Sequence, residues 1–174
     1  MMDHRERERA PLGRAVRVAR GAVAAALVAS ALTAVPGQAT DASGFAGTQL
    51  LKGQFGDLDV KLKSAAFDLK LDTKGDSDVY VTRNVIAVNG QSGWHTHPGP
   101  SLITVTVGSI VAYDADLCTP THYGTGATFV DPGGGHVHLL RNESGAVAET
   151  IAVQFVARDA PRRIDAPLPN NCNF

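Results

Sequence analysis

WHTHPGPS, residues Trp94–Ser101, is the stretch that organises this chain, and GHVH, residues Gly135–His138, echoes it. Four of the six histidines of the chain lie in these two His-x-His pairs. Residues i and i+2 of a β-strand point to the same face, about 7 Å apart along the chain. Because imidazole nitrogens bind transition metals at about 2.0–2.1 Å, two such pairs predict one metal site held by a β scaffold.

The sequence around the histidines predicts that scaffold. Residues 58–63 and 67–72 alternate apolar with polar side chains, which predicts two half-buried strands. Asn89-Gly90 predicts a hairpin-type turn. Short strands separated by Gly and Pro turns, with no amphipathic helix beyond the N-terminal segment, predict an all-β sandwich or barrel. Further β-rich runs cover residues 79–88, 102–107, 110–113 and 147–155.

Residues 1–39 have the pattern of a secretory signal peptide. Six arginines precede an apolar run, residues 21–35, and small residues end the segment at Ala39. A charged region, an apolar region and a small-residue cleavage site, in that order, predict export and cleavage after Ala39. An uncleaved membrane anchor is the alternative, although the run is shorter than the about 20 apolar residues that a spanning helix needs.

Net charge argues against two classes of partner. The leader holds six basic and three acidic residues, so the mature chain would have 10 basic and 14 acidic residues and a net charge of −4. An acidic chain is a poor ligand for nucleic acid and for anionic membrane surfaces. We therefore expect no nucleic-acid partner, and no membrane contact after cleavage.

Cys118 and Cys172 are the two cysteines of the chain. In an exported protein an even number of cysteines predicts a disulfide, which here would tie the C-terminal tail to a mid-chain loop. A role as metal ligands or as a nucleophile is the alternative, but neither cysteine belongs to a Cys-x-x-Cys pair. The predicted organisation is a leader (1–39), N-terminal strands and a linker packed on the barrel (40–78), the barrel core (79–158) and a tied-back tail (159–174).

Two segments resemble the sequence motifs of the cupin superfamily. Residues 93–108, GWHTHPGPSLITVTVG, are similar to the first motif, in which His-x-His precedes a glutamate and a glycine. Residues 126–142, GATFVDPGGGHVHLLRN, are similar to the second, with a glycine, a proline, a histidine and an asparagine in that order. The resemblance covers roughly residues 80–158. It implies a double-stranded β-helix, a jelly-roll-like cupin barrel, with a metal near one mouth.

The resemblance places the metal ligands at His95, His97 and His138. The glutamate that usually supplies the negative ligand is replaced by Ser101, whose neutral hydroxyl is a poor ligand. The second motif also has one extra glycine before its histidine. The expected cofactor is one divalent transition metal ion, and three imidazoles with open positions leave Zn, Cu, Mn, Ni and Fe as candidates.

His136 has several candidate roles. It shares strand parity with His138, which makes it a candidate fourth ligand, a catalytic base or a residue that supports the other ligands. A closed site of four histidines would be structural. An open site with a titrating histidine nearby would favour chemistry. Tyr123, between two predicted strands, is a second candidate for moving protons.

Two functional interpretations remain open. The first is a secreted, metal-dependent enzyme of the oxygenase or dioxygenase type that acts on a small molecule. The second is a non-catalytic module that binds a small molecule or a structural metal. The three histidines favour the first and the missing glutamate favours the second, and the architecture itself hosts many chemistries. The resemblance also implies that the protein can form a homodimer.

Overall fold

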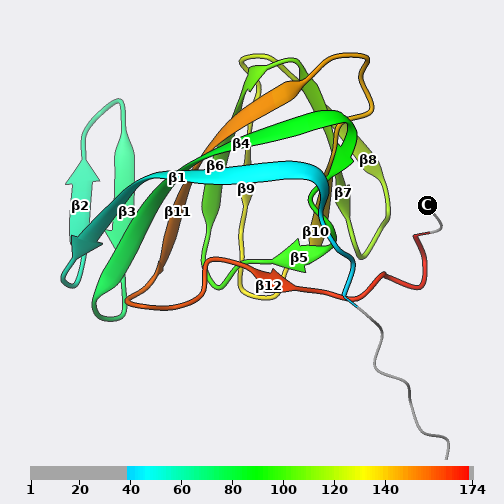
Figure 1. The fold of residues 1–174 in the computed structure, drawn as a ribbon. Helices are drawn as coiled ribbons and strands as arrows, with labels where there is room; N and C mark the ends of the chain where they lie inside the picture. Colours follow the sequence, from blue (N-terminus) through cyan, green and yellow to red (C-terminus); the bar gives the residue numbers. More distant parts are fainter. Residues whose placement is uncertain (1–38, 173–174) are drawn as a thin grey trace, which may run out of the picture. The chain divides into compact units, whose positions relative to one another are not determined.

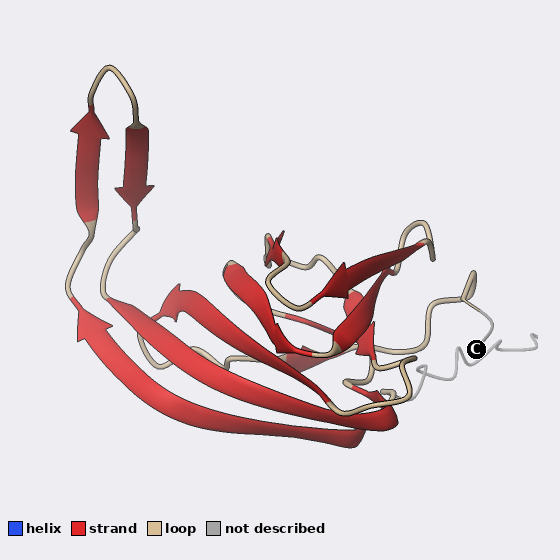
Figure 2. Cartoon of the chain, turned by 90° about the horizontal axis from the view of Figure 1, so that it is seen from above, coloured by secondary structure: helices blue, strands red, loops and turns tan. Residues whose placement is uncertain are grey.

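The structure is a computed structural model that describes residues 39–172. These residues form strands and no helix, which confirms the predicted all-β fold (Figures 1 and 2). No segment of this part of the chain is a helix that could cross a membrane. Apart from Ala39, the predicted signal peptide lies outside the described residues. The strands are β1 (Ser43–Phe55), β2 (Asp59–Lys63), β3 (Asp68–Asp72), β4 (Ser77–Gln91), β5 (His95–Thr96), β6 (Ser101–Val107), β7 (Ser109–Asp114), β8 (Pro120–Gly124), β9 (Thr128–Asp131), β10 (His138–Arg141), β11 (Ala148–Ala157) and β12 (Ile164–Asp165).

Ten of the described strands form one sheet that closes into a double-stranded β-helix, a jelly-roll-like barrel. One half has the strand order β1-β4-β11-β6-β9, and the other has the order β12-β5-β10-β7-β8. The two halves join where β10 pairs with the end of β4, at Arg141 and Gln91. All these pairs are antiparallel.

Neighbouring residues of β10 point into two different apolar clusters. Leu140 packs in a cluster with Ile86 and Val105, from the first half of the barrel. Leu139 packs with Trp94 and with Cys172, from the C-terminal tail. Because successive side chains of a strand point to opposite faces, β10 is apolar on both faces and lies between the two clusters. His138, the first residue of β10, is thereby fixed at the boundary of the packed interior.

Two local predictions differ from the structure. Asn89-Gly90 does not form a hairpin, because β4 continues through it to Gln91, and Asn89 takes up the left-handed conformation with φ of 60° inside the strand. The Asn89 N–H instead donates to the carbonyl of Asn142 at 3.0 Å. An Asn-Gly pair supplies the positive φ that a turn needs, and the same freedom accommodates an irregularity within a strand.

The predicted strands at 58–63 and 67–72 do form, as the hairpin of β2 and β3, but they are not half-buried. The two strands pair only with each other among the described residues. Val60 lies opposite Leu71, and Leu62 lies opposite Leu69, so the alternation gathers the apolar side chains on one face. That face stays largely exposed, because a two-stranded sheet has no second layer of its own to cover it.

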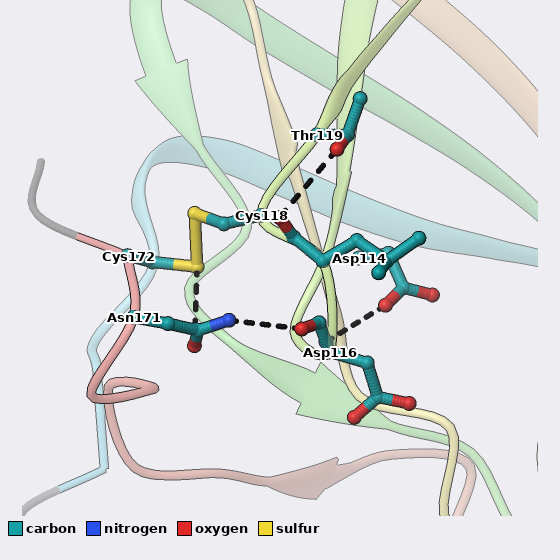
Figure 3. The surroundings of a disulfide bond; sticks show 7 residues. Asp114, Asp116, Cys118, Thr119, Asn171 and Cys172 are labelled. Atoms are coloured by element: carbon teal, nitrogen blue, oxygen red, sulfur yellow. Dashed lines mark hydrogen bonds between the residues drawn. A yellow bond between two sulfur atoms is a disulfide. The ribbon is translucent and has the colours of Figure 1, made fainter.

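A disulfide ties the C-terminal tail to the loop after β7, as predicted. It joins Cys118 to Cys172, whose Cα atoms lie 5.5 Å apart (Figure 3). Next to it, the Asn171 side-chain amide donates to the carbonyl of Asp116 at 3.0 Å. Cys172 itself is buried and packs in the cluster that contains Trp94, the residue before His95. The bridge therefore closes the tail over the part of the barrel that carries the first histidine pair.

We expect the double variant Cys118→Ser/Cys172→Ser to unfold more readily than the parent. The bridge closes a loop of 54 residues, and in the chain-entropy model its removal costs roughly 4 kcal/mol of the free energy of unfolding. Urea unfolding followed by Trp94 fluorescence measures this loss. A double variant as stable as the oxidised parent would contradict the prediction, and the parent treated with a reductant serves as the matched control.

Candidate metal centre

The pairing of β5 with β10 brings the two histidine pairs together. In this antiparallel pair His138 lies directly opposite His95. His97 follows two residues after His95, past the end of β5, and its side chain is half-buried near the other two. The three residues that the sequence predicts as metal ligands, far apart in the chain, thus meet at one place on the barrel.

The three imidazoles converge on one point. Nε2 of His138 lies 3.1 Å from Nε2 of His95. A nitrogen from each of the three rings can be chosen so that all lie within 4.8 Å of one another. The ring centroid of His97 lies 4.9 Å from the ring centroid of His95 and 5.3 Å from that of His138. This is the arrangement that a single ion bound by three imidazoles requires.

Each ring is anchored through its other nitrogen. Nδ1 of His95 donates to the carbonyl of Gly93 at 2.9 Å, and Nδ1 of His97 donates to the carbonyl of Arg162 at 2.6 Å. Nδ1 of His138 faces a carboxylate oxygen of Asp131 at 3.3 Å. With the proton on Nδ1, each Nε2 keeps its lone pair for a metal, and such partners commonly fix the tautomer and orientation of metal-binding histidines.

The carbonyl of Arg162 has a second donor. Nε2 of Gln154, on β11, donates to it at 2.7 Å and lies 2.8 Å from Nδ1 of His97. A carbonyl oxygen has two lone pairs and can accept both bonds. Gln154 and His97 are therefore held side by side on one acceptor, and β11 is linked to the segment that precedes β12.

Burial favours the neutral form of two of these imidazoles, those of His95 and His97. Removal from water, with a smaller contribution from the neighbouring His138, lowers the pKa of His95 from 6.5 to about 2. Burial also lowers the pKa of His97, although its bond to the Arg162 carbonyl opposes this. A neutral imidazole is the form that binds a metal, so the site is ready for one without first losing protons.

A glycine-rich loop places the second motif against the first. Gly133 has a φ of 67°, and a Cβ at this position would lie 2.4 Å from the carbonyl oxygen of Gly99. The N–H of Gly134 donates to the carbonyl of His97 at 2.8 Å. Only glycine permits both the left-handed conformation and so close an approach of two backbones. The loop holds Asp131, immediately before it, beside the histidines.

Asp131 is the functional residue that the sequence reasoning missed. It is 2% exposed, and its Oδ1 accepts from the Gly133 N–H at 3.2 Å and faces Nδ1 of His136 at 2.9 Å, in addition to His138. Burial raises the pKa of Asp131, but the bonds from His138 and His136 outweigh this and lower it to about 2. The sequence did hold one signal. Asp131 is two residues after the inward-facing Phe129, so its side chain points to the same face of the strand.

His136 lies beside the three histidines, on the far side of Asp131. Its Nδ1 faces Asp131, and its Nε2 lies 2.5 Å from Oδ2 of Asp114. Burial lowers the pKa of His136, but the bonds to Asp114 and Asp131 are stronger and raise it. His136 is therefore a cation held between two carboxylates at low pH, whereas burial favours the neutral form of His95 and His97. Its predicted role as fourth ligand or base stays a prediction.

Tyr123 lies on β8, and its ring stacks on Phe129 with centroids 4.4 Å apart. It lines a small cavity of about 180 Å³ that also reaches His136 and Asp131. It does not line the larger cavity in front of the three histidines. The proposed proton-moving role of Tyr123 also stays a prediction, on the His136 side of the centre.

A cavity of about 340 Å³ opens directly in front of the three histidines. Its volume falls within the range of small-molecule sites. Ser101, the position of the missing glutamate, lines it too. Its apolar wall comes from Phe45, Ile103, Leu140 and Ala152, and its polar wall comes from Thr82, Asn84, Gln154 and Arg162. The arrangement can hold a metal at one end and a small organic molecule beside it.

No protein-family model and no curated protein matches the sequence. Solved structures do resemble the fold. Peruvianin-I, a cysteine peptidase from Thevetia peruviana latex, matches at 19% identity and a TM-score of 0.50 over 77% of this chain and 74% of that one. A cupin domain from Bordetella pertussis Tohama I matches at 16% identity and a TM-score of 0.44, over 69% of this chain and 98% of that one.

The polyketide cyclase RemF from Streptomyces resistomycificus matches at 21% identity and a TM-score of 0.44, over 52% of this chain. The chain covers 63% of that cyclase's length. At such identities the likeness concerns the fold alone. The strand order and the pairing of the two motifs by themselves give the double-stranded β-helix that the sequence predicts.

In the metal-free protein we expect His95 to remain neutral down to pH 5. Its folded pKa of about 2 lies below the ordinary value of 6.5. Below pH 6.5 the imidazole of His95 is therefore protonated in the unfolded chain and neutral in the folded chain. The free energy of unfolding then decreases by about 1.4 kcal/mol for each pH unit below 6.5.

Two-dimensional NMR of the imidazoles from pH 8 to 5, with a chelator present, measures this directly. The resonances of His95 should keep their neutral positions throughout this range. A protonated His95 above pH 5 in the folded protein would contradict the burial argument. His95→Gln assigns the resonances and should reduce the loss of stability on acidification.

Proposed function

We propose that the protein is a secreted, metal-dependent cupin that binds one divalent transition metal ion through His95, His97 and His138 and takes up a small molecule in the adjoining cavity. One observation carries this proposal: three anchored imidazoles direct their Nε2 atoms at a common point beside a cavity. Within residues 39–172 the Nε2 atoms of His95 and His138 contact each other, and Nε2 of His97 has no partner within hydrogen-bond distance. A buried polar cluster of this kind is best explained by a metal.

The donor set fits such an ion. All three ligands are neutral and nitrogen-based, which suits Zn, Cu, Ni, Mn or Fe(II). A bound ion would supply Lewis acidity toward a substrate oxygen or, if redox-active, a site for dioxygen chemistry. The protein residues hold the ligands in one tautomer, exclude bulk water by burial and leave one side open to the cavity. The open side favours an enzyme of the oxygenase type over a closed structural site.

The disulfide supports the proposed location. The Cys118–Cys172 bridge is consistent with an oxidising compartment outside the cytoplasm. Secretion itself is part of the proposal, and it depends on the leader predicted from residues 1–39.

The metal content of the purified protein tests the proposal. We expect about one transition metal ion per chain by mass spectrometry, and almost none in the double variant His95→Ala/His138→Ala. His122→Ala is the matched control, because His122 is an exposed residue of β8 that lies outside the cluster. It should keep the metal of the parent.

Circular dichroism shows whether each variant is folded. A folded parent that binds no metal when incubated with Zn, Cu, Mn, Ni or Fe(II) would overturn the proposed function. Equal metal content in the parent and in a folded double variant would show that the ion lies elsewhere.

The cavity also indicates the chemical class of its ligand. Arg162 donates to the hydroxyl of Thr82 at 2.9 Å, and its guanidinium carbon lies 5.2 Å from the centroid of the Tyr80 ring. No ion pair joins it to a carboxylate within residues 39–172, whereas the adjacent Arg163 pairs with Asp165 at 2.5 Å. An arginine fixed in a cavity without an acidic partner is a ready site for a carboxylate. The proposed ligand is a small carboxylic acid.

Calorimetry of the metal-loaded protein with succinate, benzoate and their amides tests this class. The acids should bind and the matched amides should bind at least about tenfold more weakly, because only the acids form the charge-assisted pair. Arg162→Gln should remove this preference. Arg163→Gln should retain it, since Arg163 already has an acidic partner. Equal binding of acids and amides to the parent would contradict the assignment.

A further inference from the structure

We propose that the free edge of β2 is an association surface for a second copy of this chain, and that two β2 strands pair antiparallel about a two-fold axis at Val60. The hairpin of β2 and β3 lies outside residues 80–158, the segment that resembles the cupin motifs. Within residues 39–172 it contributes no side chain to the histidine cluster or to either cavity. The inference is therefore independent of the proposed metal function.

The hairpin leaves one edge of β2 uncovered. It begins and ends beside Phe55 and Ser77, which face each other where β1 pairs with β4. From there it extends away from the strands of the barrel (Figures 1 and 2). Among the described residues β2 pairs only with β3, so its other edge has no neighbouring strand. Such an edge presents a row of N–H and C=O groups to which another strand can bind.

The backbone groups at this edge belong to the odd-numbered residues of β2. At the two ends of the hairpin, the Thr73 N–H donates to the Leu58 carbonyl and the Ser64 N–H donates to the Phe67 carbonyl, both at 2.9 Å. The even-numbered positions therefore face β3, because the direction of the backbone groups alternates along an antiparallel strand. The residues of β2 that present their N–H and C=O groups to the outside are Asp59, Lys61 and Lys63.

The charges along this edge are complementary to those of a second copy. In residues 57–63, DLDVKLK, two acids precede Val60 and two bases follow it. An antiparallel copy centred on Val60 places Asp59 opposite Lys61 in both directions, and these two residues have the outward backbone groups that the register needs. A register centred on Lys61 would instead place two lysines opposite each other, which is destabilising. The charges therefore select the register at Val60.

The same charges are poorly matched inside the hairpin. Asp59 lies opposite Asp72, and Lys61 lies opposite Lys70. Each lysine contacts an aspartate of its own strand instead: Nζ of Lys61 lies 2.7 Å from Asp59, and Nζ of Lys70 lies 3.2 Å from Asp72. Like charges that face each other weaken a strand pair, so the order of charges on β2 does not stabilise its pairing with β3. A second β2 strand gives each of these charges an opposite neighbour.

The apolar face of the hairpin also favours a wider sheet. Val60, Leu62 and Leu69 are 45%, 49% and 41% exposed. A two-stranded hairpin is marginally stable alone, and three or more strands with an apolar face are more stable. Pairing of two β2 strands gives a four-stranded sheet and places the two barrels at its opposite ends. A contact limited to one strand is small, so we expect a reversible dimer.

Charge reversal on β2 tests the pairing. Lys61→Asp should raise the dissociation constant of the dimer at least about tenfold, because it places an acid opposite Asp59 of the second copy. It also removes the like-charge pair with Lys70, so it does not weaken the hairpin itself. Lys70→Asp is the matched control, because it makes the same change in net charge and relieves the same pair on β3. Sedimentation velocity over a wide range of concentrations measures the constant, which Lys70→Asp should leave unchanged.

A mixture of two impaired variants makes the test specific. Asp59→Lys should dimerise as poorly as Lys61→Asp, because it places a base opposite Lys61 of the second copy. In a mixed pair of these two variants every acid faces a base again. The mixture should therefore associate with a dissociation constant within about threefold of the parent's, although neither variant associates well alone.

Cysteine cross-linking tests the register. Val60→Cys should form an intermolecular disulfide, because the two-fold axis brings two Cβ atoms within about 5.5 Å of each other. Leu62→Cys is the matched control and should not cross-link, since Leu62 would face Leu58. The natural cysteines are joined to each other and do not compete. Non-reducing electrophoresis after mild oxidation separates the two outcomes.

A parent that stays monomeric at all concentrations would overturn the inference. If this monomer bound phosphatidylcholine vesicles, the apolar face would belong to a lipid surface instead. Equal association of Lys61→Asp and Lys70→Asp would also overturn it, because the dimer would then form elsewhere. Cross-linking of Leu62→Cys but not of Val60→Cys would contradict the register.

Discussion

The antiparallel pairing of β5 with β10 places His95 directly opposite His138, and the rest of the site is built around this pair. β5 has only two residues, so its position depends on its neighbours. On one side β10 is fixed by its two apolar faces, and on the other side β12 pairs with β5 through Ile164 and Thr96. The disulfide closes the tail that follows β12. The two-residue strand β5 can therefore hold His95 in place, because its neighbours β10 and β12 fix its position.

Burial and hydrogen bonding act together on the same side chains. Removal from water keeps His95 neutral, and the Gly93 carbonyl selects the nitrogen that carries its proton. At His138 the acceptor is a carboxylate instead of a carbonyl. The buried charge of Asp131 is itself stabilised by the donors around it. The His138 ring therefore lies between the two groups, with His95 at its Nε2 and the Asp131 carboxylate at its Nδ1.

The position of Asp131 beside the histidines depends on a close backbone contact between the two motifs. Gly133 packs against Gly99 at a distance that no side chain could tolerate. This contact draws the end of β9 toward the residues after His97, and it buries Asp131 near the histidines. The smaller cavity on the other side of Asp131 reaches His136 and Tyr123. One aspartate thus lies between a cavity that could hold a ligand and a polar path toward Asp114 near the surface.

Much of the fold was determined by the sequence alone, and so was the choice of the three histidines that the structure brings together. Period-two alternation and Gly/Pro punctuation specify strands, because side chains of a strand alternate between faces. Two His-x-His pairs in motifs of matching order therefore predicted an all-β barrel and the residues His95, His97 and His138. The cysteine count predicted the bridge, and the structure contains it.

Only the tertiary structure decided how the strands are covered and what completes the site. The alternation in β2 and β3 is the same whether a second layer covers it or not, so burial could not be read from it. Asn89-Gly90 allows a positive φ in a turn or within a strand, and only the pairing of β4 chose between them. Asp131 came to face Ser101 through the register of β6 and β9. Such a contact joins residues 30 positions apart, and it depends on long-range pairing that no local pattern encodes.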